Sequence, residues 1–541
     1  MAFFFFVCLS RKTPINMPEC RGGRIFYELC NMKHLLLPLL LVSNLMVFSG
    51  EYRLNSNVNQ AYDCVLSLRL NEAAGFLSSE KKAGTGNLFI PYLEHYSDFL
   101  KTIISEEAAI YETFKTSAGE RLKQLEKGNK SSPWYQYGIA QHYLQLGFAK
   151  LRFGHSSSAA LDINKAYRLL VRNHEMFPAF APNRTALGLM QVLIGSVPDN
   201  YRWVARLFAF EGTIEGGIAN MQRVMQDEAL KSEFPFLKAE TIFLLTFTTF
   251  NLSPGPGQSA FAEMLLNDSN NTGLITGNPL LTYSKAVFLM HQGKSSQAAE
   301  LLTAAKFDAN HYPFHYLDYL NGIARLNALD YRASLYFLKY VNHFRGKSFI
   351  KSAYQRLAWA ELLKGNEKGY FAYMQRVKLL GNTTLDGDAQ ALKEAESAAM
   401  PHVQLLQARL LFDGGYYARA EEVLQSVSPA SLPDERSRLE YQYRKARNHH
   451  EWDKTRQAIE EYKKVIAEGR NQRYYFAANA ALQLGLIYEK QNKPEEAILY
   501  YKECLSMDYD EYRSSISMKA KAGLNRLRKS PRVIHLNNGD G

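Results

Sequence analysis

A pair of small residues twelve positions apart recurs along the second half of this 541-residue chain. The first members of the pairs are 36 to 39 residues apart, with one wider gap of 50. Small side chains in two successive helices let the helices cross closely, so this repeat predicts an array of helical hairpins. The pairs are Ala286–Ala298, Gly322–Ser334, Ala408–Ala420, Ala446–Ala458 and Gly485–Ala497, and Ala358 has the bulky Tyr370 at its partner position.

The unit at 477–504 shows the pattern in most detail. An apolar run at 481–488 has helical spacing, a polar turn follows, and Pro494 falls in the first turn of the second helix, where its missing N–H costs nothing. The gap of 50 residues contains the polar, glycine-rich stretch 381–388, which we interpret as an inserted loop.

This spacing resembles the tetratricopeptide repeat (TPR), in which small residues occupy the eighth and twentieth positions of a period of about 34. The resemblance implies an all-α superhelix of helical hairpins. It also implies a concave groove lined by the second, fifth, ninth and twelfth positions of each first helix. Tyr, Trp and Arg often anchor binding, but the tyrosines could equally pack between repeats. The implied groove residues are Tyr283, Tyr319, Gln355, Trp359, His402, Arg409, Tyr443, Arg447 and Asn479.

The region 50–275 is helical but less regular, with predicted helices at Trp134–Phe153, Ala159–His174 and Thr185–Ile194. Within it, Ala181–Met225 is similar to the eukaryotic inclusion-body-clearance and outer-mitochondrial-membrane TPR family. In that family an inserted hairpin separates the two helices of one repeat. Here Gly212-Thr213 replaces the family's Gly-Asp pair, and the resemblance implies a shape for this segment.

The remaining boundaries follow from composition. We expect the repeat array at 276–530 and a disordered tail at 531–541. The stretch 32–49 has a basic start and an apolar run of fourteen residues, which is short for a membrane span and typical of a signal peptide. We therefore interpret 1–31 as a spurious extension and expect a mature chain starting at Gly50, exported to a bacterial periplasm or cell envelope.

The sequence contains no motif typical of a catalytic, nucleotide-binding or metal-binding site. Phosphate-binding loops and nucleophile elbows are missing, and His311 and His315 are separated by Pro313 without a third ligand nearby. The adjacent His449 and His450 point to different faces of a helix. We therefore predict no enzyme activity, no cofactor and no metal.

The formal net charge of +11 includes seven basic and no acidic residues in 512–536. Such a tail can meet nucleic acid or an anionic membrane, but we favour a solvated final helix. The prediction is an exported scaffold that binds a protein or peptide, with no nucleic acid, and with membrane contact and oligomeric state left open. The alternatives are a membrane-peripheral protein held by an uncleaved signal and the basic tail, and an enzyme with its site in the N-terminal half.

Overall fold

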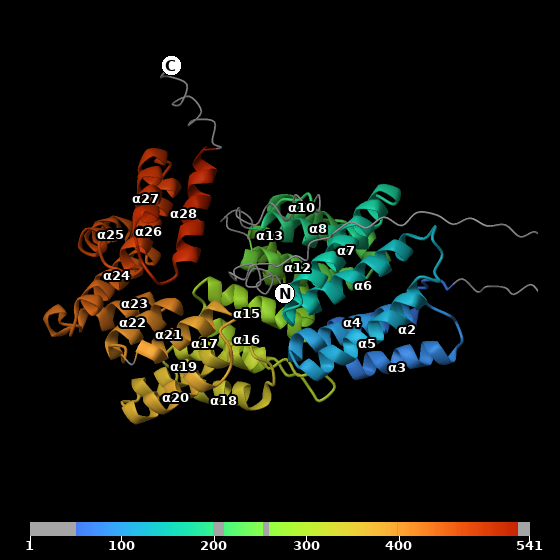
Figure 1. Cartoon of the computed structure of the whole chain (residues 1–541), viewed down its shortest axis with the longest axis horizontal. Helices are drawn as coiled ribbons and strands as arrows, with labels where there is room; N and C mark the ends of the chain where they lie inside the picture. Colours follow the sequence, from blue (N-terminus) through green and yellow to red (C-terminus); the bar gives the residue numbers. More distant parts are fainter. Residues whose placement is uncertain (1–49, 198–209, 253–258, 398, 529–541) are drawn as a thin grey trace, which may run out of the picture.

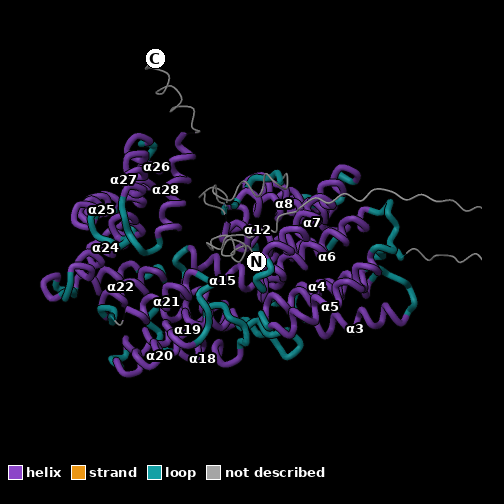
Figure 2. Tube along the Cα trace, viewed as in Figure 1, coloured by secondary structure: helices purple, strands orange, loops and turns teal. Residues whose placement is uncertain are grey.

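The computed structural model describes residues 50–197, 210–252, 259–397 and 399–528. These residues form 26 α-helices and two short 3-10 helices, and their only strand-like pairings are two isolated bridges. Figure 2 shows the helices joined by loops along the whole described chain. The predicted all-α fold class is confirmed. The predicted extension, signal peptide and tail lie outside the described residues.

The first twelve helices belong to the less regular half. They are α2 (Ser56–Leu66), α3 (Leu70–Lys82), α4 (Phe89–Ser105), α5 (Ala108–Leu125), α6 (Pro133–Arg152), α7 (Ser156–Met176), α8 (Ala181–Gly195), α10 (Ile214–Gln226), α11 (Glu228–Glu233), α12 (Phe236–Leu252), α13 (Ala260–Asn267) and α14 (Thr272–Thr276), with η2 (Ser269–Asn271) before α14. The three helices predicted in this half correspond to α6, α7 and α8.

The remaining helices form the repeat array. They are α15 (Pro279–His291), α16 (Ser295–Ala304), α17 (Tyr316–Asn327), α18 (Ala333–His343), α19 (Ile350–Leu363), α20 (Glu367–Leu379), α21 (Asp386–Ser397), α22 (Val403–Asp413), α23 (Tyr417–Gln425), α24 (Glu435–Glu451), α25 (Thr455–Gly469), α26 (Phe476–Lys490), α27 (Pro494–Ser506) and α28 (Arg513–Arg528), with η3 (Pro429–Ser431) before α24. In Figure 1, α2–α7 lie at one end, α24–α28 at the other, and α15–α17 between them.

Local sequence explains where the hairpins begin and turn. The Asn278 side chain accepts the backbone N–H groups of Leu280 and Leu281 at the start of α15, and Pro279 occupies its first turn. The tight turns inside three units use glycine with positive φ, which costs glycine little. These glycines are Gly293, Gly365 and Gly415.

Helix α12 is predominantly apolar, and Thr241, Ile242, Leu245 and Thr246 are fully buried in it. The segment therefore belongs to the protein core. Among the described residues, no helix combines the length and apolarity needed to cross a membrane.

The inserted loop predicted at 381–388 is wrong in its second half, because α21 begins at Asp386. This extra helix packs on both α19 and α20 and buries Ala391 and Ala395. Its Asp388 is fully buried and accepts the backbone N–H groups of Phe349 (2.7 Å) and Ser352 (2.9 Å) at the start of α19. Acidic residues are favourable in the first turn of a helix, so the polar stretch that looked like a loop is a helix start.

Two sets of contacts join parts of the chain that are far apart in sequence. At the first, called the latch, Glu106 forms a buried ion pair with Arg152 and accepts the backbone N–H groups of Lys347 (3.0 Å) and Ser348 (3.1 Å). Arg152 also donates to the Ser348 hydroxyl at 2.6 Å. The latch therefore ties the N-terminal half to the turn before α19.

The second set joins two hairpin turns of the array. A Cβ placed on Gly415 would lie 1.8 Å from the carbonyl oxygen of Gly293, so the two backbones touch. The backbone N–H of Ser295 also points to the carbonyl of Gly414 at 3.4 Å. The turn between α22 and α23 thus touches the turn between α15 and α16, although two other hairpins lie between them in sequence.

The close crossing predicted at Gly485 is confirmed, and its partner is an aromatic ring. A Cβ on Gly485 would lie 2.5 Å from ring carbons of Tyr501, and a Cβ on Gly523 would lie 2.4 Å from the same ring. The fully buried Tyr501 ring therefore lies between two glycines from α26 and α28.

We expect Gly485→Ala to destabilise the protein by up to about 2 kcal/mol, because overpacking costs about 1–3 kcal/mol and the gain in helix propensity returns about 1. Gly75→Ala is the matched control, since Gly75 lies in α3 with no atom within 4 Å of the new Cβ. That variant should be neutral or slightly more stable. Urea denaturation of both variants measures the difference, and equal stabilities would contradict the packing argument.

Candidate partner-binding face

Four of the nine predicted groove residues lie on first helices of the last repeats. Arg409 belongs to α22, Tyr443 and Arg447 to α24, and Asn479 to α26. The Asn479 side-chain amide donates to the Tyr443 hydroxyl at 2.9 Å, which joins α26 to α24. Tyr443 is only 5% exposed, so it packs beneath the surface formed by Arg409, Arg447 and Asn479, which we call the C-terminal face.

The two arginines of this face are held over aromatic rings. The Arg409 guanidinium lies 5.1 Å from the Trp359 ring centre, and the Arg447 guanidinium lies 4.9 Å from that of Phe412. Such cation–π contacts fix the orientation of the group without using its N–H donors for an acid.

The acids nearest to these arginines are not close enough for hydrogen bonds. Arg409 lies 3.8 Å from Asp413 and Arg447 lies 3.9 Å from Glu451, while a charged hydrogen bond is about 2.7–2.9 Å. The side chains of Arg409 and Arg447 remain 34% and 23% exposed, respectively. Both guanidinium groups can therefore donate to an incoming carboxylate.

The last helix brings a further cation toward this face. Burial, and then the neighbouring charge of Arg447, lower the pKa of Lys519 on α28.

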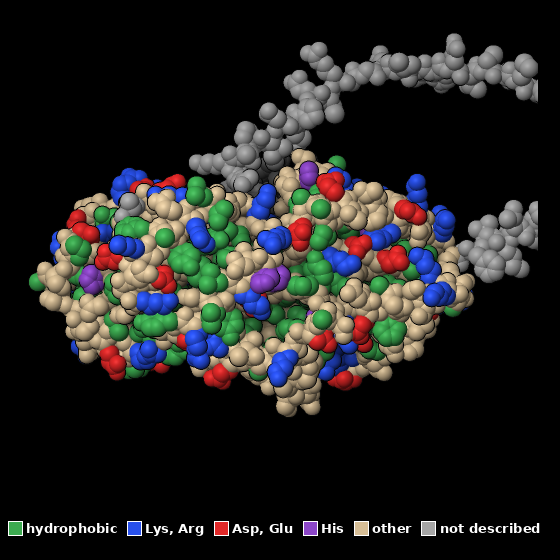
Figure 3. Space-filling view, turned by 90° about the horizontal axis from the view of Figure 1, so that it is seen from below, with side chains coloured by type: hydrophobic (Ala, Val, Ile, Leu, Met, Phe, Trp, Pro, Cys, Tyr) green, Lys and Arg blue, Asp and Glu red, His purple; other side chains and the backbone are tan. Residues whose placement is uncertain are grey.

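On the side of the molecule drawn in Figure 3, Lys and Arg side chains are interspersed with Asp and Glu side chains and with patches of hydrophobic side chains. Recognition on that side would depend on individual ion pairs, because a field of a single sign does not cover it.

Trp359 and Gln355 are covered by the extra helix α21. The Trp359 ring N–H donates to Glu394 at 2.8 Å, the Gln355 amide donates to the other oxygen of Glu394 at 2.7 Å, and Trp359 is only 3% exposed. These two residues therefore support the face from beneath and do not present a surface to a partner.

His402 lies at the edge of the same region. With Trp359, Arg409, Glu394 and Glu440 it lines a cavity of about 40 Å³. That volume has room for a water molecule or two and not for a peptide side chain. The Nδ1 atom of His402 has no hydrogen-bond partner among the described residues, so water is the natural occupant.

Tyr283 and Tyr319 do not join the C-terminal face. Tyr319 is 3% exposed, packs against Phe349 at 5.1 Å between ring centres, and shares a hydrogen bond of 2.9 Å with the Ser352 hydroxyl. Tyr283 packs against Phe314 at 5.9 Å. At these two positions the tyrosines pack between neighbouring units, as the alternative interpretation allowed.

Sequence reasoning missed several residues of this region. Glu440 and Phe412 stand at the second and twelfth positions of their first helices. Both are groove positions of the repeat, so counting positions along the repeat could have found both residues. Glu394 comes from the helix that was not anticipated. Tyr475 lies 5.7 Å from Tyr443 and just before α26, where no repeat position marks it.

The two histidine pairs considered in the sequence, His311/His315 and His449/His450, do not turn their rings toward a shared ligand position. His311 Nδ1 bonds to Asp308 at 2.8 Å, whereas the His315 ring stacks on His343 with centres 5.8 Å apart. His449 lies between Glu461 (2.8 Å) and Glu421 (3.3 Å). Across the described ranges, no group of three His, Cys, Asp or Glu side chains is arranged to hold a metal ion.

Comparison with known proteins adds little beyond this geometry. No family model matches the chain, and no curated protein matches it. Among solved structures, "Crystal Structure of P58(IPK) TPR Domain at 2.5 A" aligns with 79% of this chain and 99% of its own, at 14% identity and a TM-score of 0.20. The two chains do not superpose as wholes at such a score, so the fold assignment rests on the helical hairpins themselves.

The described part of the chain is an all-α array of successive helical hairpins. The local similarity proposed for Ala181–Met225 stays a prediction. There α8 and α10 pack directly against each other, and a Cβ on Gly217 would lie 2.4 Å from the carbonyl of Gly188. The segment between the two helices includes 198–209, outside the described residues.

Proposed function

We propose that this solenoid is a non-catalytic scaffold that holds a segment of a partner protein against its C-terminal face. Two arginines and an asparagine from three successive first helices form that face, with the buried Tyr443 beneath it. The observation that carries the proposal is the state of Arg409 and Arg447. Both are oriented by aromatic rings, partly exposed, and more than 3.5 Å from their nearest acids.

The chemistry of the face favours a partner segment that carries carboxylates. A guanidinium presents several N–H donors in a fixed fork that matches a carboxylate with two parallel hydrogen bonds. Each charged hydrogen bond contributes about 1.5–3 kcal/mol. Loss of both arginines should therefore weaken binding by about 100-fold or more.

The test is a quantitative pull-down from a cell-envelope fraction with the chain starting at Gly50. The variant Arg409→Ala/Arg447→Ala is compared with the unchanged chain. Trp359 stays in place, because it is buried and its loss would disturb the packing beneath the face. We expect partners captured by the unchanged chain to be lost by the double variant, and captured less at high salt.

The variant must keep its fold for this result to count. Ion pairs at these distances contribute little, and a cation–π contact contributes about 0.5–2 kcal/mol, so each substitution should cost at most about 2 kcal/mol. Arg456→Ala is a matched control, because Arg456 on α25 is 95% exposed and pairs loosely with Glu460 at 3.9 Å. Equal capture by all three chains would place binding elsewhere, most naturally in the N-terminal half.

Export and a role in assembling a bacterial envelope are part of the same proposal. Their support is the signal-like stretch at 32–49. Amino-terminal sequencing of the protein from the native host tests this part. A start at Gly50 supports export with cleavage and excludes the uncleaved tether, whereas an intact apolar run in the isolated protein contradicts cleavage.

A further inference from the structure

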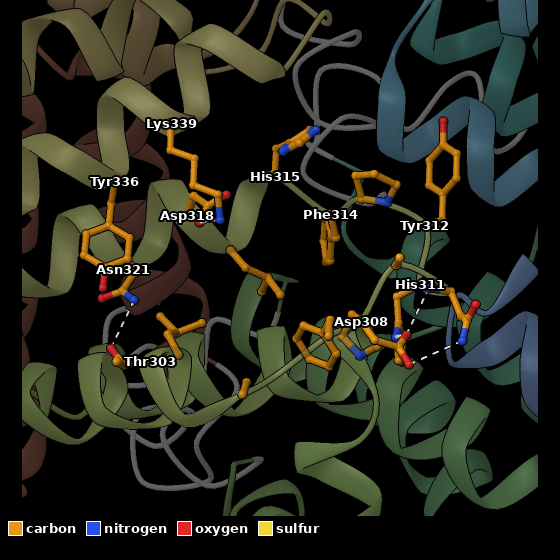
Figure 4. A pocket seen from close by; sticks show the side chains of 18 of the residues that line it. Thr303, Asp308, His311, Tyr312, Phe314, His315, Asp318, Asn321, Tyr336 and Lys339 are labelled. Carbon is orange, nitrogen blue, oxygen red and sulfur yellow. Dashed lines mark hydrogen bonds and ion pairs between the residues drawn. The ribbon is translucent and has the colours of Figure 1, made fainter.

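A cavity of about 630 Å³ lies where the N-terminal half meets the array, and none of its lining residues is a predicted groove residue. We call it the junction cavity. Its walls come from the end of α16, the start of α17, the middle of α18 and the irregular segment 305–315 that crosses between α16 and α17. Leu70 and Asn71 of α3 and Pro279 of α15 complete it (Figure 4).

The two acids of the junction cavity differ in their partners. Asp318 pairs with Lys339 at 2.9 Å, whereas Asp308 bonds at 2.8 Å to His311, which is charged only when protonated. Figure 4 shows these two pairs from different walls, with Phe314 between them. The bond to His311 lowers the pKa of Asp308, so this carboxylate keeps its negative charge. A second carboxylate beside it would be repelled, and the electrostatics therefore disfavour an acidic ligand.

The other surfaces of the cavity suit an apolar side chain and a main chain. Leu70, Pro279, Leu302 and Leu317 supply an apolar lining, together with Phe307 and Phe314. The wall at 305–315 is not helical, and the backbone N–H groups of 306–308 donate to no acceptor in the described chain. Main-chain donors and acceptors in that wall can pair with the main chain of a ligand.

We propose that the junction cavity binds a short, extended peptide segment that has an apolar side chain and no acidic one. The volume lies within the 300–1,000 Å³ that is usual for ligand sites, and its position between two parts of the fold is one where such sites occur often. The apolar side chain would lie on the leucines, and the peptide groups would bond to the wall at 305–315.

The test is a titration of the full chain, labelled at leucine methyl groups, with acetyl-Ala-Leu-Ala-amide, followed by NMR. We expect saturable shifts at Leu70, Leu302 and Leu317. The peptide with Asp in the central position should bind at least tenfold more weakly. No saturable shift with the leucine peptide, or binding of the Asp peptide as tight as that of the leucine peptide, overturns the proposal.

Variants separate this site from the rest of the surface. Ala309→Trp places a ring in the cavity from an exposed position and should weaken the leucine peptide at least tenfold. Ala467→Trp on α25 makes the same exchange at an exposed position far from the lining and should leave binding within twofold. The Arg409→Ala/Arg447→Ala variant should also bind the leucine peptide normally. Equal effects of the two tryptophans would contradict the assigned site.

Discussion

Replacement of Arg152 by alanine is expected to destabilise the protein by about 3–5 kcal/mol. Arg152 and Glu106 form the ion pair of the latch, and each side chain is only 8% exposed. Removing one partner of a buried pair leaves the other charge without compensation, which carries a cost of that size. The free energy of the first urea transition measures it.

Two further variants test this reading of the latch. The double change Arg152→Met/Glu106→Gln leaves no unpaired charge and keeps a side-chain oxygen for the backbone N–H groups of Lys347 and Ser348. It should recover more than half of the loss. The exposed Arg456→Ala should change stability by less than about 0.5 kcal/mol. A loss below 1 kcal/mol for Arg152→Ala would mean that the latch does not stabilise the junction.

Acid is expected to destabilise the N-terminal half through His142, by about 3 kcal/mol between pH 6.5 and pH 4. His142 and His95 are buried, and their rings stack with centres 3.9 Å apart. Burial, and then the charges of Arg121 and Lys150, lower the pKa of His142 to about 4. The unfolded chain takes up a proton near pH 6.5 and the folded chain does not, so stability falls as the pH falls through this range.

The wild-type profile alone cannot isolate this effect, because Glu240 acts in the opposite direction. Burial raises the pKa of Glu240 to about 7, so the folded chain binds a proton that the unfolded chain binds only near pH 4.5. The measurement is therefore the stability difference between wild type and His142→Phe. This difference should move about 3 kcal/mol in favour of the variant from pH 7 to pH 4. A change below about 0.5 kcal/mol would mean that His142 titrates as in the unfolded chain.

The sequence was most informative where its pattern follows the helical period. Small residues such as Gly485 and Ala497 mark helix crossings because only a small side chain fits there, and each crossing is local in sequence. Helix α21 was missed because its first residues, Asp386 to Asp388, are typical of turns as well as of helix starts. Only packing on α19 and α20 decides between the two.

The candidate face was predictable only in part for a similar reason. Repeat counting places Arg409 and Arg447 correctly on first helices, but it assumes that every unit is alike. It could not show that Glu394 covers Trp359, because Glu394 belongs to an element outside the repeat. Nor could it find the latch, which joins Glu106 and Arg152 to backbone and side-chain groups more than 190 residues later in the chain.

The contact between the turns at Gly293 and Gly415 bears on how this molecule responds to force. A solenoid whose units touch only their neighbours can stretch and recoil, since small rotations add up along its length. Here the turns of units separated by two others touch through their backbones. Extending this stretch would first require that contact to break. The middle of the array should therefore resist pulling as a stiff block, and elastic yielding should begin in the helices after α23.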